Sequence, residues 1–350
     1  MAMSDRRSRS DPADLGIPEA VDRWLRRKRG SLADATVREY GYRLERFREF
    51  CDEEGIEHVG QLHPLDFDDY LAYREELGVK PITMKKHFTS IGDFIGYLES
   101  LGAVDEGLSD AIPSVSVPDG GAVDDVMLKP ADGDALIDHY RNSDADYGSR
   151  QHAILEIQWF VGCRLGAVRG LDLGDFDPHD PSLTFVHRPD TDTPLKKAFS
   201  GERAVAIPQA TADAIEAYVL EERDERRDDH GREPLVTSTH GRPSPNSIRN
   251  WTYLATVPCT RGPCPHDEDP DSCEYLSSTT ASGCPSSRSP NQVRSGAITR
   301  MLHRTSKERV KYRAKTTQWE HYDHATQQQK MQHRDREVID DIGLEGDDDA

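Results

Sequence analysis

Apolar side chains recur at helical spacing through residues 18–102, and this repeat constrains the fold more than any other feature of the chain. Apolar residues three and four positions apart lie on one face of a helix, where they can pack against a core. Breaks that contain Gly, Pro or Ser divide the repeat into four runs. The apolar residues of these runs are Val21, Trp24, Leu25, Val37, Tyr40, Leu44, Phe47, Cys51, Phe67, Tyr70, Leu71, Met84, Phe88, Ile91, Ile95 and Leu98. The segment is therefore predicted to form an all-helical domain of four helices.

The remaining segments differ in composition. Residues 1–17 lack apolar periodicity, which predicts a disordered arm. Residues 103–127 are rich in Gly, Asp and Pro, which is typical of a linker. Residues 128–340 mix helical and strand patterns, and residues 341–350 form an acidic tail. The elements expected in this second domain are helices near 153–160, 210–226, 246–256 and 289–303, a short helix after Arg164, and strands at 183–187 and 204–207.

The formal net charge of -20 argues at first sight against a nucleic-acid partner. However, the chain has 33 Arg and only 11 Lys, and its acidic residues are spread over every segment, a pattern similar to that of proteins from salt-loving archaea. At about 1 M salt the screening length is only about 3 Å, so local basic faces decide whether DNA binds. No run approaches the roughly 18 apolar residues of a membrane-spanning helix, and the polar start lacks the core of a signal peptide. We expect a cytoplasmic protein with no membrane partner.

Four of the six cysteines crowd into one short stretch, together with a histidine. Disulfide scaffolds are not expected in a chain without a secretion signal, and zinc is satisfied by four Cys or His ligands. The spacing therefore favours a structural zinc site within an insertion at residues 257–288, directly before the helix expected at 289–303. The alternative is a surface insertion rich in Pro and Ser whose thiols are incidental. The candidate ligands are Cys259, Cys264, His266, Cys273 and Cys284.

Three motifs follow one another in the second domain. The first is centred on Arg164 within Trp159–Asp177, the second on Arg294 within Ser289–Thr299, and the third is His321-Tyr322-Asp323. Behind a four-helix domain and a linker, this order resembles the tyrosine recombinases of the phage integrase family, in the form found in haloarchaea. The resemblance covers residues 18 to about 335. It implies a SAM-like core-binding domain and a mixed α/β catalytic domain with a small antiparallel sheet.

The resemblance also implies a chemistry. Two guanidinium groups, those of Arg164 and Arg294, would clamp the non-bridging oxygens of a phosphodiester. Tyr322 would attack the phosphorus and hold the strand as a 3′-phosphotyrosine. A lysine on a β-hairpin would protonate the leaving oxygen, and we choose Lys196 over its neighbour Lys197. The partners implied are double-stranded DNA attachment sites and three further copies of the chain in a tetramer. No metal or nucleotide cofactor takes part in the chemistry.

Three positions depart from the family pattern. Asn291 stands where a histidine is usual and cannot move a proton as histidine does. Arg313 stands nine residues before Tyr322 where His, Trp or Asn is usual, although its guanidinium can still donate hydrogen bonds to a phosphate. Ala167 replaces a frequent glutamate. These changes leave the clamp and the nucleophile in place and put general-base catalysis in doubt.

Basic residues concentrate in two places that predict contacts with DNA phosphates. Residues 294–336 contain 11 Lys or Arg and 4 acids, a local charge of +7 in a chain of -20. Arg304 and Lys311 are our candidates there, and Lys85 and Lys86 are the candidates in the fourth helix of the first domain. The alternative is that these side chains only form a solvated, charged surface and do not contact DNA.

Two other functions remain open. A relative that kept the fold but lost catalysis would bind DNA without a covalent adduct, as Asn291 and Arg313 allow. A zinc-stabilised transcription regulator would bind through residues 18–102 alone and would not need Tyr322. A type IB topoisomerase uses similar groups, but the first domain resembles that of an integrase.

Overall fold

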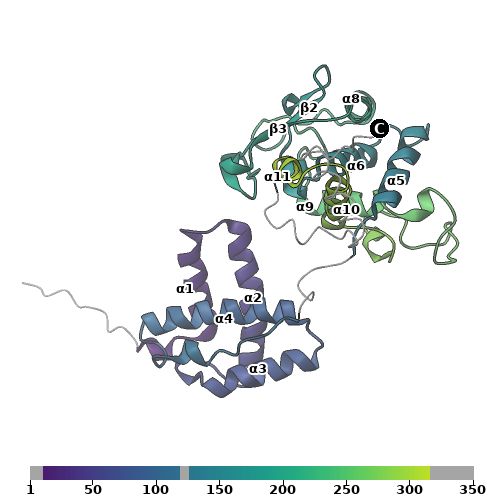
Figure 1. The fold of residues 1–350 in the computed structure, drawn as a ribbon. Coiled ribbons are helices and arrows are strands. Elements are labelled where there is room, and N and C mark those ends of the chain that lie inside the picture. The colour runs from purple at the N-terminus through teal and green to yellow at the C-terminus, as the bar shows by residue number, and fades with distance from the viewer. Residues whose placement is uncertain (1–10, 119–125, 316–350) are drawn as a thin grey trace, which may run out of the picture. The chain divides into compact units, whose positions relative to one another are not determined.

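The computed structural model describes residues 11–118 and 126–315, and the chain divides into two compact units, Met1–Asp124 and Asp125–Ala350 (Figure 1). The division between the units falls inside the predicted linker at 103–127. None of the helices in the described ranges is long and apolar enough to span a membrane. The cytoplasmic location stays a prediction.

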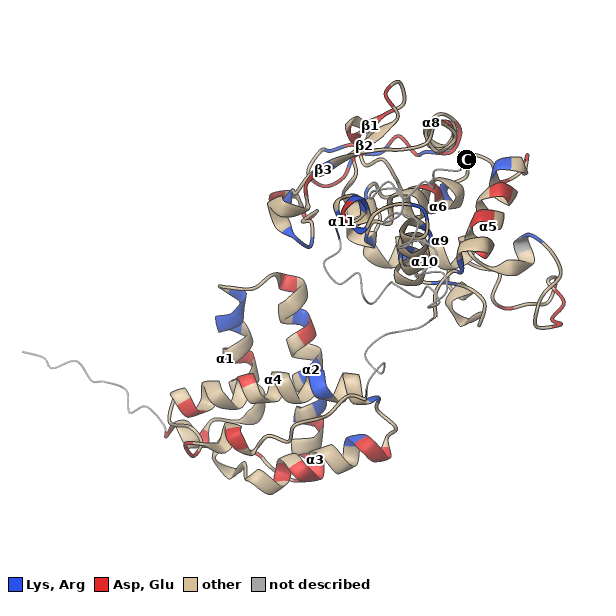
Figure 2. Cartoon of the chain, viewed as in Figure 1, with Lys and Arg blue, Asp and Glu red and all other residues tan. Residues whose placement is uncertain are grey.

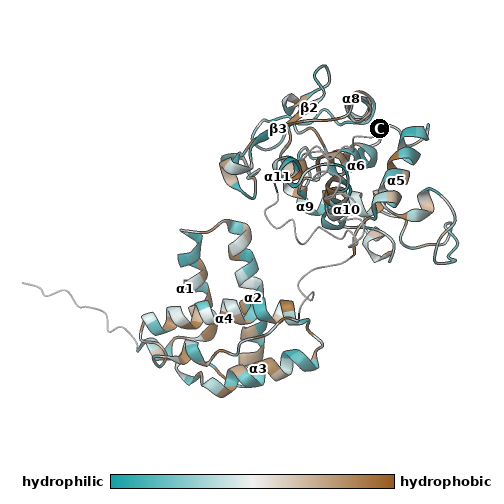
Figure 3. Cartoon of the chain, in the orientation of Figure 1, coloured by the Kyte–Doolittle hydropathy of each residue, from teal (hydrophilic) through white to brown (hydrophobic). Residues whose placement is uncertain are grey.

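The first unit contains the four predicted helices. Three of them carry a proline in their first turn, where its fixed φ favours helix entry and its missing N–H costs nothing. Hydrophobic and hydrophilic residues alternate around these helices, so each buries one face (Figure 3). Aromatic rings fill the core: Trp24 meets Phe94 edge-on at 5.9 Å, and Phe47 meets Tyr70 at 5.3 Å between ring centroids. The helices are α1 (Ile17–Arg29), α2 (Asp34–Glu53), α3 (Pro64–Glu76) and α4 (Pro81–Ser100).

At both ends of this unit, the ordered core includes residues that the sequence assigned to the arm and the linker. Residues 11–17 were expected within the disordered arm, but the Ile17 side chain is 2% exposed and its amide donates to Glu57 O at 3.2 Å. At the other end Ala103 and Leu108 belong to the core, within the segment expected to be a linker. Single apolar residues can dock on a core built by other elements, and such docking leaves no periodic signal in the sequence. The arm and the linker are accordingly shorter than predicted.

The second unit combines helices with a small sheet. Its elements are α5 (Pro130–Asn142), α6 (Arg150–Val161), α7 (Leu165–Gly170), β1 (Phe176–Asp177), β2 (Ser182–Phe185), β3 (Arg203–Ala206), α8 (Gln209–Glu221), α9 (Pro245–Ala255), α10 (Pro290–Leu302) and α11 (Lys307–Ala314). Of these elements, α5, β1 and α11 were not predicted from the sequence. The mostly helical class, with its mixed second domain, is confirmed.

The sheet is antiparallel in the order β1-β2-β3. Leu183 pairs with Val205 and Phe185 with Arg203, so these four side chains share the buried face. The strand β3 therefore directs an arginine inward beside apolar residues.

Helix α6 runs through the middle of the second unit, against α5, α8, α9 and α10 (Figure 1). It buries a charged group, Glu156, which is 0% exposed. Arg141 donates to both carboxylate oxygens at 2.7 and 3.0 Å, and Thr211 Oγ1 donates at 2.7 Å. Burial alone would raise the pKa of Glu156, but hydrogen bonds from His152 and Arg141 and the charge of Arg141 outweigh it, so the pKa is lowered.

We expect Glu156→Gln to lower the free energy of unfolding by about 3 kcal/mol at pH 7, because it breaks a buried ion pair. A group with a lowered folded-state pKa stabilises the fold above its unfolded pKa, about 4.3 for Glu, and this contribution is lost as pH falls through the folded value. The difference between wild type and variant should therefore narrow below about pH 4. Urea unfolding of the wild type and the variant, at pH 7 and below about pH 4, measures this difference in the free energy of unfolding. The control Glu222→Gln removes an exposed partner of Arg150, 3.7 Å away, and should cost under about 1 kcal/mol.

Candidate active site

The chain turns sharply at the end of α6 to present Arg164. Gly162 adopts a left-handed conformation with φ of 64°, and a Cβ atom there would lie 2.8 Å from Met301 Cε. Only glycine is accommodated at such a position without strain. Arg164 follows two residues later, directly before the first residue of α7.

The two predicted clamp arginines come to the same place although 130 positions separate them. Arg294 lies on α10, which starts with a capping box at Ser289, and its side chain is 1% exposed. Its Nη1 donates to Gly162 O and, at 2.9 Å, to Ala314 O. Arg164 Nη1 donates to Lys315 O at 3.3 Å. Both guanidinium groups thus meet around the C-terminal end of α11.

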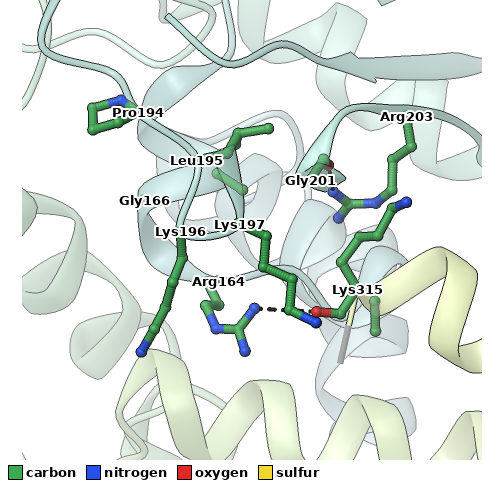
Figure 4. Close-up of a pocket in the computed structure, with 11 residues that line it drawn as sticks. Arg164, Gly166, Pro194, Leu195, Lys196, Lys197, Gly201, Arg203 and Lys315 are labelled. Atoms are coloured by element: carbon green, nitrogen blue, oxygen red, sulfur yellow. Dashed lines mark hydrogen bonds between the residues drawn. The ribbon is translucent and has the colours of Figure 1, made fainter. Parts of the chain in front are cut away.

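A cavity of about 270 Å³ opens beside Arg164 (Figure 4). Five of the eleven residues that line it are Lys or Arg, and none is Asp or Glu, although acids outnumber bases in the chain. Such a lining repels cations and attracts a phosphate. The lining residues are Arg164, Gly166, Ala167, Pro194, Leu195, Lys196, Lys197, Gly201, Arg203, Ala314 and Lys315.

Both lysines of the β2–β3 connection line this cavity, but they differ in environment. Lys196 is exposed and Lys197 half-buried. Burial lowers the pKa of Lys197, and the charges of Arg164, Arg294, Lys311 and Lys315 lower it further. Figure 4 shows the amine of Lys197 directed toward Lys315 and that of Lys196 on the other side of Arg164.

Arg203, which was not predicted as a site residue, lines the cavity from the sheet. Its guanidinium lies 4.3 Å from the centroid of the Phe185 ring and donates to Arg313 O at 2.8 Å and Gly201 O at 2.9 Å. Burial lowers the pKa of Arg203. The signal was available, because strand alternation places this arginine on the same face as Val205.

Arg313 and Asn291 are not among the residues that line the cavity. Arg313 Nε donates to Phe160 O and its Nη1 to Ala206 O, both at 2.7 Å, so its guanidinium ties α11 to α6 and to the end of β3. Asn291 is exposed near the start of α10, one turn before Arg294. Tyr322 lies outside the described residues.

The residues predicted to contact DNA differ in their exposure and in whether they form an ion pair within the protein. Lys85 and Lys86 are exposed on α4, while acids gather on α3, as Figure 2 shows. Arg304 is 59% exposed and pairs with Asp134 at 3.1 Å. Lys311 is exposed on α11.

A second cavity lies in the insertion. All five predicted metal ligands line it, namely Cys259, Cys264, His266, Cys273 and Cys284. In the described part of the chain no three Cys, His, Asp or Glu side chains are already placed to hold a metal ion. The five candidate ligands therefore line one cavity, but their side chains do not yet form a coordination site.

Comparisons with known proteins point to one fold. Residues 21–102 match the family model described as phage integrase, N-terminal SAM-like domain. No curated protein sequence matches the chain.

Among solved structures, a portion of the Tn1549 transposon integrase in complex with transposon right end DNA is 14% identical with a TM-score of 0.62, covering 93% of this chain and 100% of that one. A lambda integrase dimer bound to a core site is 11% identical with a TM-score of 0.59, covering 96% of this chain and 80% of that one. A lambda integrase tetramer bound to a Holliday junction is 12% identical with a TM-score of 0.58, covering 90% and 82%. The chain has the tyrosine recombinase fold with an N-terminal SAM-like domain.

Proposed function

We propose that this chain is a site-specific DNA recombinase that cleaves and rejoins DNA strands through a 3′-phosphotyrosine on Tyr322. The observation that carries the proposal is the cavity at Arg164, lined by five cations and no acid, with Arg294 beside it. This charge distribution suits a phosphodiester, and it occurs in a fold shared with integrases solved on DNA.

The two arginines are suited to hold the reacting phosphate. A planar guanidinium donates two parallel hydrogen bonds to charged oxygens, and two of them can hold both non-bridging oxygens as negative charge builds up at phosphorus. At present the carbonyls of Ala314 and Lys315 accept from these groups. A phosphate oxygen carries a full charge and is the stronger acceptor, so DNA would take over these donors.

The chain after Lys315 is long enough for the proposed nucleophile to reach the cavity. Lys315 lines the cavity, and Tyr322 follows it by seven positions, which an extended chain spans with at most about 25 Å. The tyrosine hydroxyl gives up its proton to solvent water, its oxygen forms a bond to phosphorus as the bond to the 5′-oxygen breaks, and the 5′-oxygen takes up a proton from the lysine. The reverse attack by another 5′-hydroxyl rejoins the strand and releases the tyrosine. No metal enters this exchange.

We assign the role of proton donor to Lys197. The sequence alone had favoured its neighbour Lys196. Lys197 is the less exposed of the two, and burial and nearby cations lower its pKa, which suits its ammonium group to donate a proton. Its side chain lies between Arg164 and Lys315, beside the position proposed for the phosphate (Figure 4). Arg313 is assigned to positioning α11, and Asn291 to neither acid nor base catalysis.

Lys197→Ala should slow cleavage by about 10²- to 10⁴-fold, the range of positioned acid groups. A substrate with sulfur in place of the bridging 5′-oxygen should remove most of this defect, because a thiolate with a pKa near 8.5 leaves without a proton. The matched control is Lys196→Ala, with little change on either substrate. A defect rescued by sulfur in Lys196→Ala, and absent from Lys197→Ala, would return the role to Lys196.

The partners proposed are double-stranded DNA and further copies of the chain. Lys85 and Lys86 on α4 would contact DNA phosphates from the first unit, and Lys311 and Arg304 from the second. Tetramer formation on DNA is proposed by analogy with the lambda integrase tetramer on a Holliday junction. Adaptation to high salt remains a prediction.

Covalent trapping tests the function. A DNA site nicked next to the scissile bond releases the short strand with the 5′-hydroxyl after cleavage, so rejoining is prevented and the phosphotyrosine adduct should accumulate. Protease digestion should then remove the protein from the DNA. Mapping of the DNA-linked peptide should find Tyr322. A protein that binds the site without forming an adduct would be the non-catalytic relative that Asn291 allows.

A further inference from the structure

The four cysteines of the insertion, Cys259, Cys264, Cys273 and Cys284, surround a single cavity of about 170 Å³. Cys264, Cys273 and Cys284 are less exposed than most of their neighbours, and Cys259 is half-buried. Cys284 is 6% exposed. All four are free thiols. Four separate stretches of a polar loop therefore bring a cysteine to the lining of one cavity.

The insertion has little else to hold it together. Of residues 257–288, whose side chains are described except at 260, those that are buried are Val257, Ala281, Cys284 and Ser287. A segment this poor in buried apolar surface needs a disulfide or a metal to become ordered. Four thiols around one centre suit a tetrahedral ion better than two separate bridges.

Two of the four thiols are in direct contact, because Cys259 and Cys264 share a hydrogen bond. A divalent cation bound by thiols displaces their protons, so the ligands of a filled site would be thiolates.

We propose that the four cysteines of the insertion bind one zinc ion, which holds this segment in its fold. Zinc binds thiolate sulfur at about 2.3 Å, so the side chains would rotate into the cavity and close it. His266 also lines the cavity but is exposed, and it stays outside the coordination sphere. The proposal does not depend on the proposed recombinase activity.

The zinc is structural and separate from the phosphate cavity. The base of the insertion is already closed by Thr256 Oγ1, which donates to Arg288 O at 3.2 Å and accepts from Arg288 N at 2.7 Å. The capping box at Ser289 then starts α10. The helix that carries Arg294 is thus positioned without the metal, and the ion orders only the loop beyond this base.

Metal analysis of the full chain, purified under reducing conditions, should find one zinc per chain. Cys273→Ser should lose it, whereas the neighbouring Ser272→Ala and the His266→Ala variant should keep it. Replacement by Co²⁺ should give the intense thiolate-to-metal absorption of an all-sulfur site, unchanged in His266→Ala. Zinc-free wild type, zinc retained by Cys273→Ser, or zinc lost from His266→Ala would each overturn the assignment.

A second measurement guards against a variant that simply unfolds. Chelation of wild-type protein should increase amide hydrogen exchange within 257–288 and leave α1 to α4 and α10 protected, and added Zn²⁺ should restore protection. Unchanged exchange in the insertion after the metal has been removed would contradict a structural role.

Discussion

The Tyr322→Phe protein should form no covalent adduct with a nicked DNA site, while its affinity for the intact site stays within a few-fold of wild type. The hydroxyl supplies the nucleophile, whereas affinity comes from many phosphate contacts. Single-turnover adduct formation and DNA binding at the same salt concentration measure the two effects.

Tyr312→Phe is the matched control, because it removes a phenol hydroxyl from an exposed position on α11, ten residues earlier in the chain. It should form adduct at the wild-type rate. An undiminished adduct in Tyr322→Phe, or its loss in Tyr312→Phe, would move the nucleophile elsewhere and with it the proposed mechanism.

Arg164→Ala should slow adduct formation by about 10²- to 10³-fold, the usual cost of removing one preorganised donor to a transition state. Arg164→Lys should recover only part of the rate, because an ammonium group cannot make the paired hydrogen bonds of a guanidinium. The reaction should be followed with protein in excess over DNA, so that chemistry and not binding is measured.

The control for lost charge is Arg227→Ala, an exposed arginine paired with Glu233. It should leave the rate within about twofold of wild type, since exposed ion pairs contribute little. A loss below about tenfold in Arg164→Ala, with the melting temperature unchanged, would remove this residue from the clamp.

The four helices of the first unit could be predicted because each keeps an apolar face over three or more turns. Helix α11 was not predicted, since its eight residues bury only Val310 and Ala314 and offer no periodicity. The packing of Ile17 and Ala103 depends on a core built by other elements, which a local pattern does not report.

At the site, the arginine pair was recognised from its motifs, and the structure places both arginines around the end of α11. The sequence could not show which of Lys196 and Lys197 donates the proton. The two neighbours are the same residue type, and they differ in burial, which depends on the fold. Arg313 shows a second limit. Its residue type allows a phosphate contact, but its donors meet the carbonyls of Phe160 and Ala206, and which acceptor a long side chain reaches is decided by the fold.

The two hydrogen bonds between Thr256 and Arg288 also have an evolutionary consequence. Because the chain leaves and re-enters the helical body at one point, the length of the intervening segment hardly affects the body, and doubling it adds only about 0.6 kcal/mol to the entropy of loop closure. This junction is therefore a place where sequence can be gained, lost or exchanged while α9 and α10 keep their spacing. We expect that an engineered module grafted between the same two residues leaves the packing of α9 and α10 unchanged.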